Sequence, residues 1–249
     1  MHESPYRSIW IGFEPREADA FAVCKWSLEL YCKYLPIRGI ILRRVQELGL
    51  YTRPLERLPL QDGGFQMWDP ISEAPMSTEF AISRFLTPLL AKQMYGAKAG
   101  WALFMDCDVL ARDNITKLFE LADKKYAVMC VKHNHRPLEG HKMDGVAQVQ
   151  YERKNWSSVM LFNCDHPSND KLTVEMVNSV PGRDLHRFCW LEDDEIGSLG
   201  VEWNYLVGHS PSGVNPKLVH FTDGVPTMPG YENVEYAREF IDRLTEWAS

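Results

Sequence analysis

The sequence predicts a single α/β domain in which a mostly parallel central sheet carries helices on both faces. Two observations lead to this fold class. Short apolar runs typical of buried strands alternate along the chain with segments whose apolar residues recur at helical spacing. No Gly/Ser-rich linker, internal repeat or low-complexity run divides the 249 residues. We therefore expect one domain over residues 1–249, with a C-terminal extension from about residue 210.

The first part of the chain begins with a strand and a helix. The apolar run 8–13 predicts a buried strand, and helical spacing over 18–35 predicts a helix that stops at Pro36. The apolar run 39–45 predicts a second strand. Prolines and paired glycines over 48–75 predict a long surface loop, and loops of that length tend to be functional.

The second part continues the alternation. Residues 77–96 predict one amphipathic helix with a kink or break at Pro88, because proline cannot donate the helical hydrogen bond. Residues 101–110 predict a buried strand that ends in two acids. The same patterns predict a helix at 114–124, strands at 126–133 and 155–166, a helix at 172–180 and a terminal helix at 236–248. In such a sheet, ligands bind at the carboxyl ends of the strands.

Composition and charge exclude several classes of protein. The 45% apolar and 24% charged residues exclude disordered, collagen-like and coiled-coil chains. The six cysteines form no C-x-x-C pair, which predicts reduced thiols and disfavours a structural zinc site. A net charge of −7 disfavours general binding to nucleic acid or anionic membranes. We expect no transmembrane segment and no secretory signal, hence a cytoplasmic protein.

The most informative motif is the acid pair Asp106 and Asp108 at the end of an apolar strand. Residues two apart on an extended strand point to the same side, so the two carboxylates share one small volume. Their repulsion and desolvation favour a cation between them, and hard divalent ions such as Mg²⁺ or Mn²⁺ suit oxygen ligands. The alternative is that one acid caps the next helix and the other pairs with Arg112.

Four segments, in the right order, resemble GT-A nucleotide-sugar glycosyltransferases, and especially their family 8-like group. They are STEFAISRF (77–85), similar to the helix before the D-x-D strand; NWSSVMLFN (155–163), similar to the N-S-G-V segment; LEDDEIGSLGVEWN (191–204), similar to the D-Q segment followed by W-N; and KLVHFTDGVP (217–226), similar to the H-F-x-G tail. The resemblance covers most of the chain. It implies a GT-A-type, Rossmann-like domain with a nucleotide-binding half over 1–110, a sugar and acceptor half over 111–209, and a metal-ligand tail and helix over 210–249.

The resemblance also implies a metal site. Asp106 would contact the ribose and the metal, Asp108 would bind the metal, and His220 would be the third protein ligand. An imidazole ligand favours Mn²⁺ over Mg²⁺. The alternative for His220 is a packed histidine whose hydrogen bonds are satisfied.

The resemblance further assigns residues to the donor and to catalysis. Arg84 would reach the diphosphate or the donor sugar, with a surface ion pair to Glu79 or Asp69 as its alternative. Asp193 and Asp194 match the acidic pair that faces the transferred sugar, so at least one of them should point inward; the alternative is a solvated turn.

The remaining predicted donor-binding residues are Gly12, Phe13, Glu14, Arg16, Ser157, Ser158 and Gly224. The exit of the first strand would contact the nucleoside, or else form a simple turn. This chain departs from the family at two places. It has Trp156 at the head of the N-S-G segment, which leaves Asn155 or Ser157 to contact the sugar. It also lacks the tail lysine, so that Lys217, Arg16 or Arg84 would have to neutralise the diphosphate.

The function implied is that of a hexosyltransferase-like enzyme that moves a sugar from a nucleotide-sugar donor, a UDP-sugar by resemblance, with retention of configuration. The sequence leaves both front-side attack and double displacement through Asp193 or Asp194 open, and the resemblance favours front-side attack. The alternative functions are a magnesium-dependent phosphohydrolase of the haloacid dehalogenase type and a non-catalytic nucleotide-sugar-binding module.

The acceptor is open: a glycan, a lipid-linked sugar, a small molecule or modified DNA, and a homo-oligomer is also left open. The basic, histidine-rich segment 131–142 would lie near the acceptor or form a solvated loop. We expect few apolar residues to anchor the tail after Pro211, so that donor and metal would order it.

Overall fold

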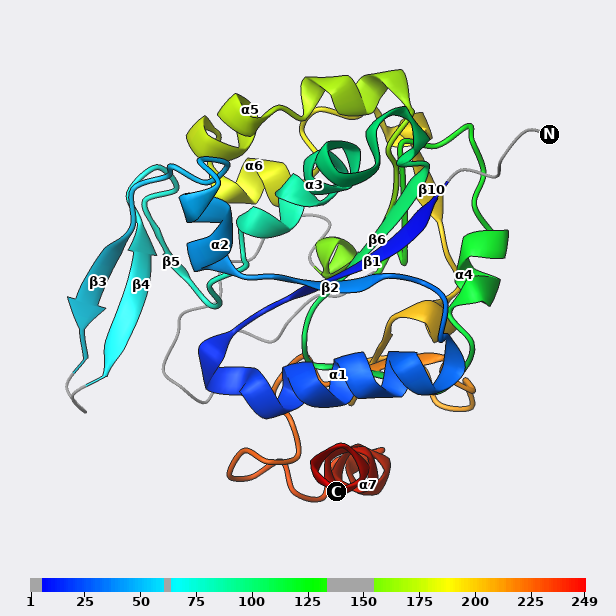
Figure 1. Ribbon diagram of the computed structural model, residues 1–249. Coiled ribbons are helices and arrows are strands. Elements are labelled where there is room, and N and C mark those ends of the chain that lie inside the picture. Colours follow the sequence, from blue (N-terminus) through cyan, green and yellow to red (C-terminus); the bar gives the residue numbers. More distant parts are fainter. Residues whose placement is uncertain (1–5, 61–63, 134–154) are drawn as a thin grey trace.

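The computed structural model describes residues 6–60, 64–133 and 155–249. Its centre is a mixed six-stranded sheet with the strand order β10-β8-β9-β6-β1-β2 (Figure 1). The strands are β1 (Arg7–Gly12), β2 (Ile37–Ile40), β6 (Trp101–Met105), β8 (Val128–Cys130), β9 (Val159–Asn163) and β10 (Ile196–Ser198). β9 runs antiparallel to both of its neighbours, and the other three pairings are parallel. The predicted α/β class with a mostly parallel sheet is confirmed.

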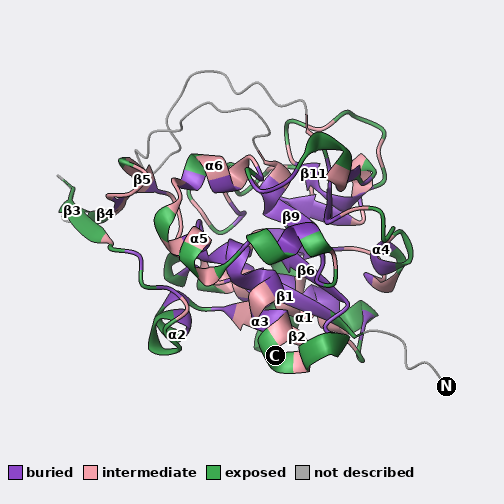
Figure 2. Ribbon diagram, turned by 90° about the horizontal axis from the view of Figure 1, so that it is seen from above, coloured by how far each residue is buried: buried purple, intermediate pink, exposed green. Residues whose placement is uncertain are grey.

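The central strands are buried on both sides. Every residue of β6 and of β9 is buried, as expected for continuous apolar runs in the middle of a sheet (Figure 2). Helix α1 (Ala18–Tyr31) lies against one face, with α7 (Ala237–Ala248) outside it, and α3 (Thr87–Tyr95) lies on the other face (Figure 1). Among the described residues, none of the helices is long and apolar enough to cross a bilayer.

The segment between β2 and α3 differs from the prediction. The chain leaves β2 at Ile40 and forms α2 (Leu42–Glu47), so the predicted strand at 39–45 is half helix. The predicted loop contains β3 (Glu56–Pro59), β4 (Phe65–Asp69) and β5 (Ala74–Met76), which form a separate antiparallel sheet beside the domain (Figure 1). All four residues of β3 are exposed, so no apolar alternation marked it as a strand.

The segment predicted as one helix over 77–96 is also divided. Only Thr87–Tyr95 is α-helical, and Pro88 lies in its first turn, where its missing amide hydrogen costs no helical bond. Shorter helices complete the body: α4 (Thr116–Glu120), α5 (Val174–Ser179) and α6 (Gly182–His186). The 3₁₀ turns are Pro15–Glu17, Ser83–Leu86, Gly96–Lys98, Trp156–Ser158, Pro167–Lys171, Asp193–Glu195 and Val201–Trp203.

The C-terminal tail is packed by apolar contacts. Strands β11 (Tyr205–Leu206) and β12 (Leu218–His220) form a second sheet with β7 (Val109–Ala111). A second hydrophobic cluster joins this sheet, α1 and α7, and its buried members are Ala20, Val23, Leu110, Val219, Phe221, Val225 and Phe240. The expectation that few apolar residues anchor the tail is therefore wrong. The missed anchors are separated in sequence and face a helix from the other end of the chain.

Candidate functional site

The two acids lie in the short turn between β6 and β7. The strand breaks after Met105, and the Asp106 amide donates to the Ser158 carbonyl at 2.9 Å. Both acid side chains are 15% exposed, whereas Cys107 between them is buried. The acids therefore share one side as predicted, but through a turn rather than through one continuous strand.

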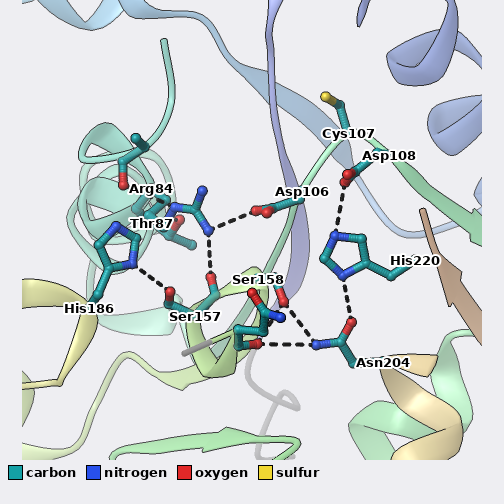
Figure 3. Close-up of polar contacts among 12 residues, drawn as sticks. Arg84, Thr87, Asp106, Cys107, Asp108, Ser157, Ser158, His186, Asn204 and His220 are labelled. Atoms are coloured by element: carbon teal, nitrogen blue, oxygen red, sulfur yellow. Dashed lines mark hydrogen bonds and ion pairs between the residues drawn. The ribbon is translucent and has the colours of Figure 1, made fainter. Parts of the chain in front are cut away.

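His220 reaches this turn because β12 pairs with β7. The two strands are antiparallel with His220 opposite Val109, and the Phe221 amide donates to the Asp108 carbonyl at 3.0 Å. His220 Nε2 lies 3.3 Å from Asp108 Oδ1 (Figure 3). One ligand atom from each of Asp106, Asp108 and His220 lies within 4.8 Å of the others. The structure thus brings together the three predicted ligands across a long sequence separation.

This donor set fits a divalent metal ion. Two carboxylates supply hard oxygen ligands and the imidazole supplies a nitrogen, a combination that suits Mn²⁺ and, less well, Mg²⁺. The alternative partner of the acids is occupied elsewhere, since Arg112 Nε lies 2.7 Å from Glu239 Oε2. Asp106, Asp108 and His220 could therefore hold such an ion.

Arg84 lies beside the acid pair. Its Nη1 is 2.8 Å from Asp106 Oδ1 and donates to the Ser157 carbonyl at 2.9 Å (Figure 3). The guanidinium also lies 5.1 Å from the ring centre of Phe80 and 5.2 Å from that of Phe104. The side chain is thereby held with its charge at the site. Of its two alternative partners, Asp69 is bound to Arg53 instead.

Ser157 and Ser158 lie behind the acids, and both are buried. Ser157 Oγ is 2.6 Å from His186 Nδ1, and Ser158 Oγ accepts from Asn204 Nδ2 at 2.9 Å. Burial, the larger cause, and the positive charge of Arg84, the smaller one, hold the pKa of His186 well below its usual range. This imidazole is therefore neutral. Both hydroxyls therefore serve contacts within the protein.

His186 and Asn204 were not predicted as site residues. His186 lies in α6, whose short segment carries no motif. Asn204 lies in the W-N pair at the end of the segment 191–204, which was a usable signal. Its role depends on a contact with β12, and that contact becomes visible only in the fold.

The exit of β1 lies next to the acid pair. β1 and β6 are parallel with Ile11 level with Met105, so Gly12 follows at the same edge as Asp106. A Cβ atom on Gly12 would come within 2.4 Å of the Phe80 ring, so glycine is required for this packing.

The loop after Gly12 is held by Glu14. This buried carboxylate accepts from the Glu79 amide at 2.8 Å and pairs with Arg16 Nε at 2.8 Å. Phe13 packs edge-on against Phe21 at 5.1 Å between ring centres. Contact of this loop with a nucleoside stays a prediction.

Asp193 and Asp194 lie away from the metal ligands. They are exposed and precede β10, which runs parallel to β8 and hence points the same way as β6. They therefore sit at the edge where the parallel strands begin, whereas Asp106 sits where β6 ends. The expectation that one of them points into the site is wrong, because the register of β10 places them at the opposite edge.

Two tail positions also have contacts of their own. Lys217 lies over the Trp203 ring at 4.5 Å and 3.9 Å from Glu202, and its neutralising the diphosphate stays a prediction. Gly224 forms a turn after Phe221, where a Cβ atom would come within 2.7 Å of Tyr231. Residues 134–142 of the basic, histidine-rich segment lie outside the described residues.

Comparisons with known structures identify the fold. The chain matches the glycosyltransferase GlyE of Streptococcus pneumoniae TIGR4 with a TM-score of 0.59 and 14% identity, over 97% of this chain and 62% of that one. It matches the galactosyltransferase LgtC, solved with donor and acceptor sugar analogues, with a TM-score of 0.55 and 16% identity, over 97% of this chain and 96% of that one. For the bifunctional glycosyltransferase WbbM the values are 0.58 and 12%, and the chain spans 50% of its length. The resemblance to GT-A glycosyltransferases, including family 8 enzymes, is confirmed at the level of the fold.

The sequence comparison identifies a relative. No family model matches the chain. Protein CDI of Arabidopsis thaliana is 41% identical over 251 residues, which cover 98% of this chain and 88% of that protein. The chain therefore belongs to the family of Protein CDI, and it has the fold of the GT-A glycosyltransferases.

Proposed function

We propose that the protein is a metal-dependent glycosyltransferase that takes a sugar from a nucleotide-sugar donor, specifically a UDP-sugar. The observation that carries this proposal is the meeting of Asp106, Asp108 and His220 at the carboxyl end of a central strand. The sequence motif supplies only two of the three ligands. The fold supplies the third from a segment more than a hundred residues away.

The protein groups at the site suit a nucleoside diphosphate leaving group. A divalent ion held by Asp106, Asp108 and His220 would offset the negative charge that develops on the departing nucleoside diphosphate. Arg84 carries a planar cation whose geometry matches phosphate oxygens, and its contacts to Asp106 and Ser157 hold it beside the ligands. Such fixed charges stabilise a transition state without reorganisation.

We further propose transfer with retention by front-side attack. Double displacement needs a carboxylate close to the anomeric carbon, and the two acids considered for that step, Asp193 and Asp194, lie at the other edge of the sheet. The chain's part in front-side attack is to orient the donor and to stabilise the leaving group.

The alternatives differ in what they require. The observed GT-A fold favours a transferase over a phosphohydrolase of the haloacid dehalogenase type. A non-catalytic module would bind a nucleotide sugar and leave it intact. The acceptor can be tested in the screen described next, with a glycan, a lipid-linked sugar, a small molecule and modified DNA as the candidates.

The test is a screen of nucleotide sugars with and without Mn²⁺, in which donor hydrolysis and thermal stabilisation are both measured. We expect one class of donor, with Mn²⁺, to stabilise the protein and to be slowly hydrolysed, and we expect Asp108→Asn to lose both effects. Asp113→Asn is the matched control, because Asp113 is a nearby acid that pairs with Lys117 outside the site.

Each other result has a distinct meaning. Stabilisation without turnover, even with candidate acceptors, supports the binding module. Phosphatase activity without donor selectivity supports the phosphohydrolase. An Asp108→Asn protein that behaves like the wild type would remove the metal site from the mechanism.

A further inference from the structure

A chain of buried hydrogen bonds leads from the backbone to the candidate ligand His220. Ser158 Oγ donates to the Asn155 carbonyl at 2.8 Å, and Asn204 Nδ2 donates to Ser158 Oγ at 2.9 Å. At its other end, Asn204 Oδ1 lies 2.9 Å from His220 Nδ1 (Figure 3). Asn204 is fully buried and His220 is 2% exposed, so solvent does not compete for these bonds.

The direction of this chain follows from its first member. A carbonyl oxygen can only accept, so the single Ser158 hydroxyl hydrogen points at Asn155. Ser158 Oγ must then accept from Asn204, which requires the amide nitrogen of Asn204 to face the serine. The same nitrogen also lies 3.4 Å from the Asn155 carbonyl, a second acceptor that fits only a donor.

The amide orientation in turn determines the histidine tautomer. With its nitrogen toward Ser158, Asn204 presents its oxygen to His220, so Nδ1 must carry the hydrogen of this bond. A neutral imidazole has one such hydrogen. Its Nε2 therefore keeps a lone pair, and that lone pair faces Asp108 Oδ1 at 3.3 Å.

We propose that Asn204 is a positioning residue, which locks His220 in the Nδ1–H tautomer and aims its Nε2 lone pair at a divalent cation shared with Asp108. Two acceptors that face each other at 3.3 Å repel unless a cation lies between them, so the arrangement is preorganised for the ion. This inference rests on the proposed metal site, but it concerns the tautomer, which the protein sets without the metal.

The test uses variants of Asn204 with two readouts. Nitrogen NMR of histidine-labelled, metal-free protein reports the His220 tautomer, and Mn²⁺ titration followed by electron paramagnetic resonance reports affinity. The wild type should show the Nδ1–H form. Asn204→Leu removes the acceptor and should give a mixed or Nε2–H tautomer with roughly 10–100-fold weaker Mn²⁺ binding. Asn204→Asp loses the donor to Ser158 but keeps an oxygen acceptor at Nδ1, so it should keep the hydrogen on Nδ1 and more of the Mn²⁺ affinity than Asn204→Leu.

Two further variants guard against loss of fold. Asn169→Leu removes another buried, hydrogen-bonded asparagine, which bonds to Ala127 and Asn163 at the far edge of the sheet, and it should leave tautomer and affinity unchanged. Ser158→Ala is the milder test if Asn204→Leu does not fold. Without the acceptor at Oγ the Asn204 amide keeps only the 3.4 Å contact to the Asn155 carbonyl, so its orientation is held less firmly, and we expect a several-fold loss of Mn²⁺ affinity.

The outcomes separate the two proposals. If the wild-type protein shows the Nδ1–H tautomer but binds no Mn²⁺, the proposed metal site is overturned. The proposal that Asn204 sets the tautomer of His220 would still stand. A wild-type protein that binds Mn²⁺, with Asn204→Leu binding it equally well or keeping the same tautomer, would overturn the positioning role. Weakened binding in Asn204→Leu, with an altered tautomer and an unchanged Asn169→Leu control, is the expected result.

Discussion

At the scale of single residues, the two acids of the candidate site have different neighbours. Asp106 pairs with the buried Arg84, whereas Asp108 faces His220. Asp108→Asn should therefore fold with little loss of stability and bind Mn²⁺ at least about tenfold more weakly, because its charge serves the ion. Asp106→Asn should in addition lose about 1–3 kcal/mol of unfolding free energy, since Arg84 loses a charged partner. Urea unfolding and Mn²⁺ titration measure the two effects separately. Equal stability of the two variants would show that the Arg84 pair contributes nothing to folding.

His186 predicts a pH dependence of stability. Burial and the charge of Arg84 lower the pKa of His186 in the native protein below the ordinary histidine value of about 6.5, so the unfolded chain binds a proton in a pH range where the native protein does not. The contribution of His186 to the free energy of unfolding is fully present above about pH 6.5. It is lost as the pH falls below that value, by up to about 1.4 kcal/mol per pH unit.

The matched variant is His186→Asn, whose side-chain oxygen can still accept from Ser157. The free energy of unfolding should depend less steeply on pH in this variant than in the wild type between about pH 5 and 7. Parallel curves for the two proteins would mean that His186 takes up its proton over the same pH range in the native and unfolded states, so that its pKa is not depressed.

At the scale of elements, helix α7 holds the strand that carries His220. Phe240 packs edge-on against Phe221 at 5.3 Å between ring centres, and Phe221 directly follows the histidine. Phe240→Ala should cost about 3–5 kcal/mol and increase hydrogen exchange in β12 and the turns after it, more than in β6. Exchange that rises equally throughout the domain would argue against this local linkage. Because the C-terminal tail is packed by its own apolar cluster, binding of donor and metal should add little to its protection from hydrogen exchange.

The small sheet β3-β4-β5 depends on a buried ion pair. Arg53 Nη2 lies 2.6 Å from Asp69 Oδ2, both side chains are fully buried, and Arg53 also donates to the Val177 and Val180 carbonyls. Arg53→Met should cost about 3–5 kcal/mol, because it leaves the Asp69 carboxylate buried without its cation.

A double-mutant cycle tests this element. Arg53→Met with Asp69→Leu should be less destabilised than the sum of the two single variants, since no uncompensated charge remains. Unfolding free energies of the four proteins give the coupling, and simple additivity would contradict it.

At the scale of the whole molecule, the thiols report the integrity of the core. All six cysteines are free, five of them are buried, and burial holds the pKa values of Cys24 and Cys107 well above their usual range. The native protein should therefore react with a thiol reagent once, slowly, at the exposed Cys189, and six times after denaturation. A fast reaction of several thiols in the native protein would show that the core opens readily.

Local sequence patterns predicted much of this architecture. The buried strands β1, β6 and β9 and the helices α1 and α7 were predicted from apolar periodicity, because each carries a long enough run to show its period. The acid pair was equally local, since two carboxylates after an apolar strand are placed by adjacent residues. The pattern missed β3, whose residues are all exposed, and the helix start at Thr87, which depends on where Pro88 falls in the first turn.

The sequence by itself thus determined the fold class and one half of the candidate site, the Asp106 and Asp108 turn. Resemblance to a family pointed to His220, but only the pairing of β12 with β7 brings its imidazole to Asp108. The tertiary structure alone decided that Asp193 and Asp194 lie at the opposite edge, and that Asn204 supports the histidine. The physical reason is that strand register and long-range pairing depend on how distant surfaces pack, and a local sequence pattern carries no information about its distant partner.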